Sequence, residues 1–208
     1  MKIINAGVEP LEEIDASAIM RKLERAGRVC YKSEGNIKED SAEKFIKGII
    51  KRGHESVIEH EAITLKIICD RGVTHELVRH RIASYSQEST RYCDYSSGKF
   101  AAELTFIKPC YWQEDDEKYK LWLEVMEQTE KNYLALRAMG AKPEEARSIL
   151  PNSLKTEIVV TMNLREWRHF LRLRTATAAH PQMREVALMI RDILIEKLPA
   201  VFGDIGED

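Results

Sequence analysis

The sequence predicts a single domain with a mixed core of helices and strands. Its 208 residues are enough to bury one substantial core, so we expect residues 1–208 to form one domain. Apolar residues spaced by three and four, which are typical of helices, are interspersed with shorter alternating or β-branched runs, which are typical of strands. Both kinds of element are therefore expected in one fold.

The overall charge argues against a dedicated binder of nucleic acid. Charged residues make up 32% of the chain, yet the formal net charge is −2, whereas nucleic-acid-binding domains are usually basic. No apolar run approaches the roughly 20 residues that cross a bilayer. The N-terminal stretch also lacks the basic and apolar regions of a signal peptide. We expect a cytoplasmic protein, without a membrane segment, whose arginines are concentrated locally for small phosphorylated ligands.

The four cysteines do not form a recognisable site. Cys30, Cys69, Cys93 and Cys110 are widely separated and include no CxxC pair, which argues against a zinc ribbon or a disulfide scaffold. Cys93 could be a nucleophile, but no base is placed beside it by sequence, and a reduced thiol is the better interpretation.

The N-terminal part predicts a strand and two helices. Residues 2–8 are expected to form the strand, and residues 11–25 a helix that ends before Gly27. Residues 41–52 are expected to form the second helix, with Ile46 and Ile49 on its buried face and Gly53 as its stop.

The segment that follows contains two histidines, in GHESVIEH. His54 and His60 are six residues apart, which is neither the i, i+4 spacing of a helical metal site nor a known zinc pattern. No metal is expected. A loop with a capping histidine is the structural alternative to a ligand contact.

A third strand and a short helix lead to the most distinctive stretch of the chain. Residues 62–69 alternate as a strand does, and a turn follows at residues 70–72. Thr74 is the expected N-cap of a helix that delivers Arg79 at its far end. Glu76 lies about one turn before Arg79, close enough to orient it, or alternatively supplies favourable charge in the first turn.

Residues 79–91, RHRIASYSQESTR, carry three arginines, one histidine and four serine or threonine hydroxyls but few side chains for a core. On a helix, Arg79 and Arg81 would point to nearly opposite sides. On an extended chain they share one side and His80 faces the other. Either geometry suits two neighbouring ligands, or one ligand shared between chains.

The central part of the chain predicts a connection and then helices. Residues 92–108 show little periodicity and are expected to be an exposed or mobile connection, whereas residues 115–139 carry the longest helical pattern. A short helix opens at Pro143 and contains Arg147 among apolar residues. A buried charge there would need a partner, for example Glu144 or Glu145.

The C-terminal part predicts a strand over residues 157–162 followed by two helices. Asn163 and Glu166 have the spacing of a capping box that opens the helix REWRHFLRLR. Arg168 and Arg172 are interpreted as a solvated basic face. The next helix is expected over residues 184–198.

One motif in this chain resembles the signature of the flavin-dependent thymidylate synthases. Arg79-His80-Arg81, seven intervening residues and then Ser89 match its RHR-x7-S form, and Arg91-Tyr92 follows. Further matching segments occur in the same order, namely Gly-His-Glu at residues 53–55, Ala-Arg-x-x-Leu-Pro at 146–151 and Asn-x-Arg at 163–165. The resemblance implies an α+β, ThyX-like subunit in a homotetramer whose active sites are shared between subunits.

The resemblance also implies which residues bind the ligands. The cofactor would be FAD, bound by His54, Ser56, Arg79, His80, Arg81, Gln87, Asn163, Arg165 and His169. The substrate dUMP would be bound by Glu76, Arg79, Gln87, Glu88, Ser89, Thr90, Arg91, Arg147 and Arg174.

The implied reaction is the methylation of dUMP to dTMP, with methylenetetrahydrofolate as carbon donor and NADPH as reductant through FAD. Arg174 matches the arginine that activates uracil, and a guanidinium can stabilise negative charge on the pyrimidine. No cysteine has an activated setting, which agrees with an enzyme that does not use one. Many family members read Asn-Glu where this chain has Ser86-Gln87, a change that removes a charge from the site.

Two functions from other classes remain open at this point. A nucleic-acid-binding module could use the arginine-rich segments as a phosphate track, and its affinity would depend steeply on salt. A purely structural oligomerisation domain would bind no ligand and would be colourless. Only the enzyme requires a yellow, flavin-loaded protein.

Overall fold

A computed structural model of the chain describes residues 1–206, which fall into two compact units. Each unit is made of segments that are distant in the sequence. Unit 1 comprises Met1–Gly7, Ile67–Arg79 and Ser86–Ile158. Unit 2 comprises Val8–Lys66, His80–Tyr85 and the chain from Val159 onward.

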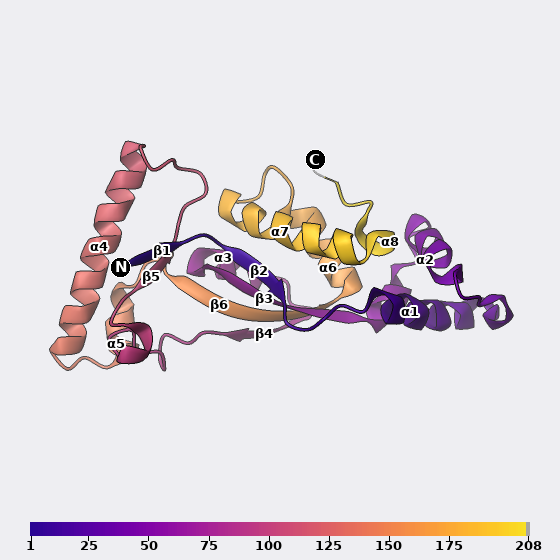
Figure 1. The fold of residues 1–208 in the computed structure, drawn as a ribbon, viewed down its shortest axis with the longest axis horizontal. Helices are drawn as coiled ribbons and strands as arrows, with labels where there is room; N and C mark the ends of the chain where they lie inside the picture. The colour runs from indigo at the N-terminus through magenta and orange to yellow at the C-terminus, as the bar shows by residue number, and fades with distance from the viewer. Residues whose placement is uncertain (207–208) are drawn as a thin grey trace. The chain divides into compact units, whose positions relative to one another are not determined.

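The strands form two sheets (Figure 1). In unit 1, β1 (Lys2–Ile4) pairs in parallel with β5 (Thr105–Ile107). The larger sheet has the order β2-β3-β6-β4, with bounds Gly7–Pro10, Ala62–Asp70, Lys155–Asn163 and Ala83–Gln87. The single strand expected over residues 2–8 is therefore wrong, because the chain leaves one sheet after Ile4 and enters the other at Gly7.

Strands β3 and β6 show the burial that their sequences predict. Ile63, Leu65 and Ile67 are buried on alternate positions of β3, and Ile158, Val160 and Met162 do the same on β6. The strands expected over residues 62–69 and 157–162 are thereby confirmed.

Helices α1 (Ala16–Tyr31) and α2 (Ser41–Lys51) pack together in unit 2 (Figure 1). The Asp15 side chain accepts a hydrogen bond of 2.8 Å from the backbone N–H of Ala18, so α1 begins later than expected. Gly27 is buried inside α1 rather than beyond its end. The predicted bounds of α2 agree with the structure, and Gly53 follows it with φ of 71°.

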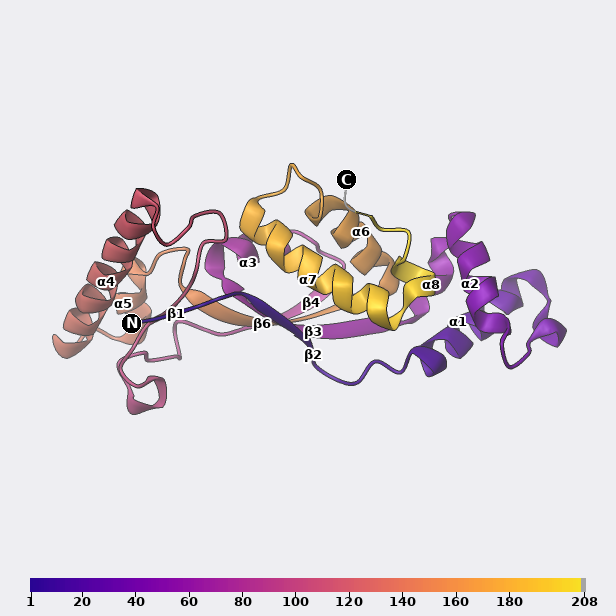
Figure 2. The ribbon, with the colours of Figure 1, turned by 45° about the horizontal axis from the view of Figure 1, so that its top comes forward.

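The C-terminal helices of unit 2 are α6 (Leu164–Arg174), α7 (Pro181–Lys197) and α8 (Pro199–Phe202), and α6 and α7 lie side by side (Figure 2). Pro181 occupies the first turn of α7, where its missing N–H costs no hydrogen bond. The last long helix therefore starts three residues before the predicted start at residue 184. Unit 2 also contains short 3-10 helices at η1 (Glu34–Asn36) and η2 (Glu55–His60).

Unit 1 contains α3 (Arg71–Leu77), α4 (Glu117–Ala138) and α5 (Pro143–Ala146), with 3-10 turns at η3 (Gly98–Phe100) and η4 (Arg147–Ile149). The N-cap of α3 is Asp70, whose side chain accepts from the N–H of Val73 at 2.7 Å. The prediction of Thr74 as the cap is wrong, because that hydroxyl donates back to the Arg71 carbonyl inside the helix.

Residues 92–108 are not the exposed connection that the sequence suggests. Tyr95, Leu104 and Phe106 are buried in the apolar cluster of unit 1, together with Trp122 and Tyr133 of α4. Aromatic residues without helical or strand periodicity build this part of the core, so a search for periodicity missed it.

No helix among residues 1–206 combines the length and the apolarity that a bilayer crossing requires.

The Gly27→Ala substitution should destabilise the protein by roughly 1–2 kcal/mol, because overpacking outweighs the helix propensity that alanine adds. An added Cβ would lie 2.6 Å from Phe45 Cε1 and 3.1 Å from Val57 Cγ1. Urea unfolding measures the change. Gly35→Ala is the control, since nothing lies within 4 Å of its Cβ position. Phe45→Leu should relieve part of the loss; an undiminished loss in the double variant would contradict the clash.

Candidate active site

The N-terminus of α6 forms one side of the candidate site. Asn163 ends β6 and caps α6, since its Oδ1 accepts a 2.8 Å hydrogen bond from the N–H of Glu166. This confirms the predicted cap. The carboxylate of Glu166 turns instead toward His80, with 3.3 Å between Oε1 and Nδ1. Two of the first amides of α6 are thus engaged, because the N–H of Leu164 also donates to the Glu61 carbonyl at 3.0 Å.

A cavity of about 520 Å³ opens at this end of α6. Three residues of the predicted cofactor set line it: Asn163 caps α6, and Arg165 and His169 lie about one turn apart on it. The lining residues are Glu55, Glu59, Ile82, Asn163, Arg165, Glu166, His169 and Arg172.

The arginines of this cavity are paired with carboxylates. Arg165 Nη1 lies 2.5 Å from Glu59, and Arg172 Nη2 lies 3.0 Å from Glu55. Burial alone would raise the pKa of Glu55, but the hydrogen bond from Arg172 and the charge of Arg168 hold it below its ordinary value. An anionic ligand would therefore compete with Glu55 and Glu59 for these cations.

Arg168 does not belong to a solvated basic face, contrary to the prediction. Its side chain is 0% exposed and donates to Glu55, to Asp204 and to the carbonyl of Val201. Helical spacing alone could not separate it from Arg172, which is half-exposed.

His80 is the buried member of the Arg-His-Arg triplet, whereas Arg79 and Arg81 are exposed. Its Nε2 accepts a hydrogen bond from Arg174 Nε at 3.1 Å, and its Nδ1 lies within hydrogen-bond distance of Glu166. The Tyr85 hydroxyl donates to the His80 backbone carbonyl at 2.6 Å. The imidazole ring of His80 packs edge-on against Phe170, with 5.0 Å between the ring centroids.

These partners fix the protonation of His80. Arg174 Nε can only donate, so Nε2 must carry the lone pair and Nδ1 the proton that it donates to Glu166. Burial, followed by the charges of Arg174 and His169, lowers the pKa of His80 to about 4. Burial also raises the pKa of Glu166 above its ordinary value and that of Tyr85 to about 12. His80 is therefore neutral at pH 7.

His80, Glu166 and His169 also offer two nitrogens and one carboxylate oxygen that lie within 4.8 Å of one another. Such a donor set suits a divalent cation. A metal on Nδ1 of His80 would move the proton to Nε2, where it would meet the N–H of Arg174. We therefore assign this cluster to hydrogen bonding.

Two further residues of the predicted cofactor set are the sequence neighbours of Glu55, which lines the cavity. His54 and Ser56 are exposed on either side of Glu55. His54 does not cap η2; its Nδ1 lies 2.6 Å from the Tyr31 hydroxyl.

The predicted nucleotide residues belong to unit 1, with the exception of Arg174. Arg147 is exposed rather than buried, and its Nη1 lies 3.4 Å from Thr90 Oγ1. Its expected partner Glu144 instead faces Arg91, at 3.6 Å. The N–H of Arg91 donates to Ser89 Oγ at 3.3 Å.

Gln87 and Glu88 are engaged inside unit 1. Gln87 Nε2 donates to Thr74 and Thr156, each at 3.2 Å. The Glu88 carboxylate accepts from Tyr95 at 2.8 Å and pairs with Lys155 at 2.9 Å. Both side chains thus hold β4 and the loop after it in place.

Glu76 and Arg79 lie at the C-terminal end of α3. Because α3 begins at Arg71, Glu76 falls in its last turn, and the alternative of favourable first-turn charge is wrong. Arg79 Nε donates to the His75 carbonyl at 3.2 Å, and that hydrogen bond orients its guanidinium.

The four cysteines differ in their burial. Cys69 is buried in β3, and burial, with the charge of Asp70, raises the pKa of its thiol. Cys30 and Cys110 are exposed, and Cys93 is half-buried.

Comparisons with known proteins agree with the motif. Residues 14–200 match the family described as Thymidylate synthase complementing protein. The flavin-dependent thymidylate synthase of Pyrococcus furiosus is 41% identical over 186 residues, which are 89% of this chain and 74% of that protein. That of Geobacter sulfurreducens is 34% identical over 188 residues, 87% of this chain and 79% of that protein.

The chain belongs to the flavin-dependent thymidylate synthase family.

A solved structure shares the fold of this family member. It is a UMP/dUMP methylase PolB from Streptomyces cacaoi bound with 5-Br dUMP, with a TM-score of 0.77 at 23% identity. The match covers 98% of this chain and 96% of that one.

The sequence did not indicate that Glu55, Glu59 and Glu166 line this cavity. Glu55 lies inside the recognised Gly-His-Glu segment, and Glu166 was interpreted only as part of a capping box. Glu59 pairs with an arginine 106 residues away, and no local pattern reports such a pair.

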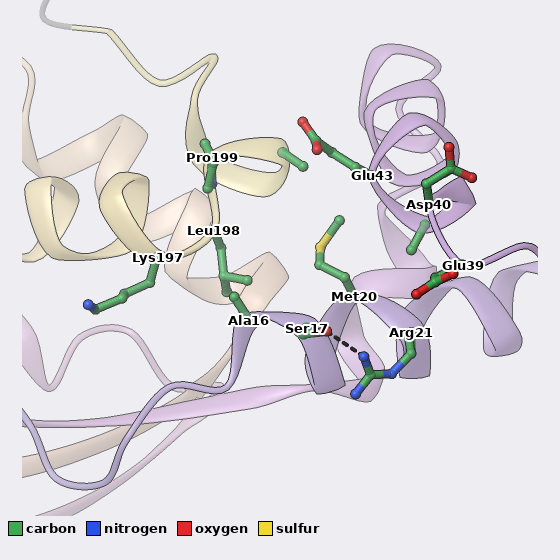
Figure 3. Close-up of a pocket in the computed structure, with 12 residues that line it drawn as sticks. Ala16, Ser17, Met20, Arg21, Glu39, Asp40, Glu43, Lys197, Leu198 and Pro199 are labelled. Atoms are coloured by element: carbon green, nitrogen blue, oxygen red, sulfur yellow. Dashed lines mark hydrogen bonds between the residues drawn. The ribbon is translucent and has the colours of Figure 1, made fainter.

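A second cavity, of about 360 Å³, lies at the start of α1 and contains none of the predicted site residues (Figure 3). Met20 and Leu198 contribute apolar surface, and Glu39, Asp40 and Glu43 contribute carboxylates. Arg21 bonds to Ser17 at its edge. We assign it no role in this family's chemistry.

Acidification should destabilise the protein partly through His80. Between pH 6.5 and about 4, the unfolded chain binds a proton that folded His80 does not, so stability should fall across this range and be independent of His80 above it. Glu166 acts in the opposite direction, because its raised pKa lets the folded chain keep a proton that the unfolded chain has lost.

Urea unfolding at several pH values measures this dependence. In His80→Gln, which leaves Glu166, His169, Arg174 and Tyr85 in place, stability should fall less steeply below pH 6.5. Equal slopes for the two proteins would show that His80 is not held neutral.

Proposed function

We propose that the chain is a thymidylate synthase that methylates dUMP to dTMP, with methylenetetrahydrofolate as carbon donor and NADPH as reductant through bound FAD. Family membership supports this activity, because relatives at 34–41% identity are named flavin-dependent thymidylate synthases. Within this chain, the observation that carries the proposal is Arg174, whose guanidinium is held by buried His80 beside a cavity suited to a phosphorylated cofactor.

The residues around the cavity fit FAD. Arg165 provides donors for a diphosphate that would replace Glu59 as its partner, and Asn163 keeps the start of α6 in place. His169 and Ile82 add flat and apolar contacts. When bound, FAD supplies the redox chemistry, and the protein supplies position and charge. With these four residues, the proposed cofactor set includes His54, Ser56, Arg79, His80, Arg81 and Gln87.

Unit 1 contributes cations and hydroxyls for the nucleotide. Guanidinium forks suit phosphate oxygens, and Arg79, Arg91 and Arg147 are all exposed and able to reach a ligand. Ser89 and Thr90 provide hydroxyls beside Arg91 and Arg147. The rest of the proposed nucleotide set is Glu76, Gln87, Glu88 and Arg174.

Arg174 makes the pyrimidine reactive in this proposal. Its guanidinium stabilises negative charge that develops on the ring, which makes C5 nucleophilic without a covalent bond to the enzyme. The high pKa of Cys69 agrees with a reaction that uses no cysteine nucleophile. Arg174 is therefore the proposed catalytic residue.

We also propose a homotetramer, and α4 provides the support. Leu121 and Val125 lie one turn apart on it and are 64% and 50% exposed. A subunit contact would bury this surface.

Light scattering should give a mass near four times 24.0 kDa, and the double substitution Leu121→Lys with Val125→Lys should lower this mass. A monomeric wild type would contradict the proposal. The cytoplasmic location and the single domain stay predictions.

The purified protein should be yellow and should release tritium from C5-labelled dUMP when folate and NADPH are supplied. Arg174→Ala and Arg174→Lys should keep the flavin spectrum and slow this release by about 10²-fold or more, because neither keeps a positioned guanidinium. Arg25→Lys, on the exposed face of α1, is the control and should match the wild type. A colourless protein with strongly salt-dependent affinity for DNA would indicate the nucleic-acid-binding alternative.

A further inference from the structure

Arg174 is held through its inner nitrogen. Nε donates to His80 Nε2 at 3.1 Å, and this hydrogen bond restrains the rotation of the guanidinium plane. A planar fork is useful against a flat ring only when its plane is fixed. The acceptor nitrogen of His80 therefore contributes to how Arg174 is presented.

Only one tautomer of His80 can accept this hydrogen bond. A neutral imidazole has one donor and one acceptor nitrogen, and the hydrogen bond at one nitrogen selects the form of the other. Glu166 Oε1 lies 3.3 Å from Nδ1. An ionised carboxylate accepts hydrogen bonds but cannot donate them, so it selects the Nδ1–H form of His80. That form leaves the Nε2 lone pair for Arg174.

The surroundings of His80 leave it little freedom to turn. It is 5% exposed, its ring packs against Phe170, and Tyr85 donates to its backbone carbonyl. Glu166 is itself fixed one turn inside α6, where its N–H bonds to Asn163. The series of hydrogen bonds that runs from Asn163 through Glu166 and His80 to the Arg174 guanidinium is thus continuous and mostly buried.

We propose that Glu166 and His80 are positioning residues for Arg174: Glu166 fixes the tautomer of His80, and His80 fixes the plane of the Arg174 guanidinium. This assigns Glu166 a role that the sequence did not suggest and gives His80 one beyond contact with the cofactor. The inference rests on the proposed function of Arg174.

The test compares Glu166→Ala with Glu166→Gln. Alanine removes the acceptor for Nδ1–H, whereas the glutamine amide oxygen keeps it. In Glu166→Ala, kcat for tritium release from C5-labelled dUMP should fall by about 10²-fold, with KM for dUMP within about threefold and the flavin spectrum retained. Glu166→Gln should stay within about threefold of wild-type kcat. Equal losses in both variants would overturn the tautomer argument, as would an unchanged kcat in Glu166→Ala.

Three further measurements separate positioning from general damage. Nitrogen-15 NMR of the His80 ring should show Nδ1–H in the wild type and a shift toward Nε2–H in Glu166→Ala. In an Arg174→Ala background, Glu166→Ala should cause no further loss, since both act through one guanidinium. Glu24→Ala removes another buried, paired carboxylate, of α1, and should lower stability but not kcat.

His80→Phe keeps the ring that packs on Phe170 and removes both nitrogens, so it should reproduce the kcat loss even if Glu166→Ala fails to fold. A wild-type protein without tritium release would contradict the proposed function. An active wild type with an additive double variant would contradict only the positioning role.

Discussion

A fully buried guanidinium constrains how unit 2 is assembled. Arg168 of α6 is 0% exposed, and an unpaired charge at such a position would cost several kcal/mol. Burial alone would lower its pKa, but hydrogen bonds from its side chain to Asp204 and Glu55 keep the pKa above the ordinary value. The turn at η2 and the segment after α8 must therefore be in place whenever α6 is folded.

The same interaction extends to the cavity. Glu55 accepts from Arg168 and also from Arg172, and both Glu55 and Arg172 line the cavity at the start of α6. One carboxylate thus joins the interior of unit 2 to its ligand-facing surface. Helix α6 carries Arg165, Glu166, His169 and Arg174 at positions whose spacing is fixed by the helix. The residues of α6 that pack the interior of unit 2 therefore also fix the positions of those that face the cavity.

Periodicity predicted the elements whose burial repeats and failed where burial has another cause. Strand β3 and helix α2 could be predicted because apolar residues recur at the period of a strand or a helix. Gly27 looked like a helix stop, but it is the point where α1 approaches Phe45 closely. The residues around Tyr95 build a core without any period, so nothing local in the sequence reports them.

Motifs grouped some of the residues that line one cavity but did not indicate their partners. Asn163, Arg165 and His169 were expected near one ligand, and they line one cavity. Arginines of one helix looked alike in sequence, yet Arg168 is buried and Arg165 is exposed. Arg165 pairs with Glu59 and Arg168 pairs with Glu55, and both carboxylates come from the distant η2 turn. Such pairing depends on the tertiary fold.

Histidine at the centre of a catalytic motif suggests an acid or a base, and the contacts of His80 point to neither. Its lone pair is occupied by Arg174 and its proton by Glu166, so at neutral pH it has nothing to give or take. In the proposed reaction, the proton that leaves C5 would pass to a different acceptor, such as solvent or a group brought in with the ligands. His80 would then act as a fixed dipole rather than as a carrier in a proton relay.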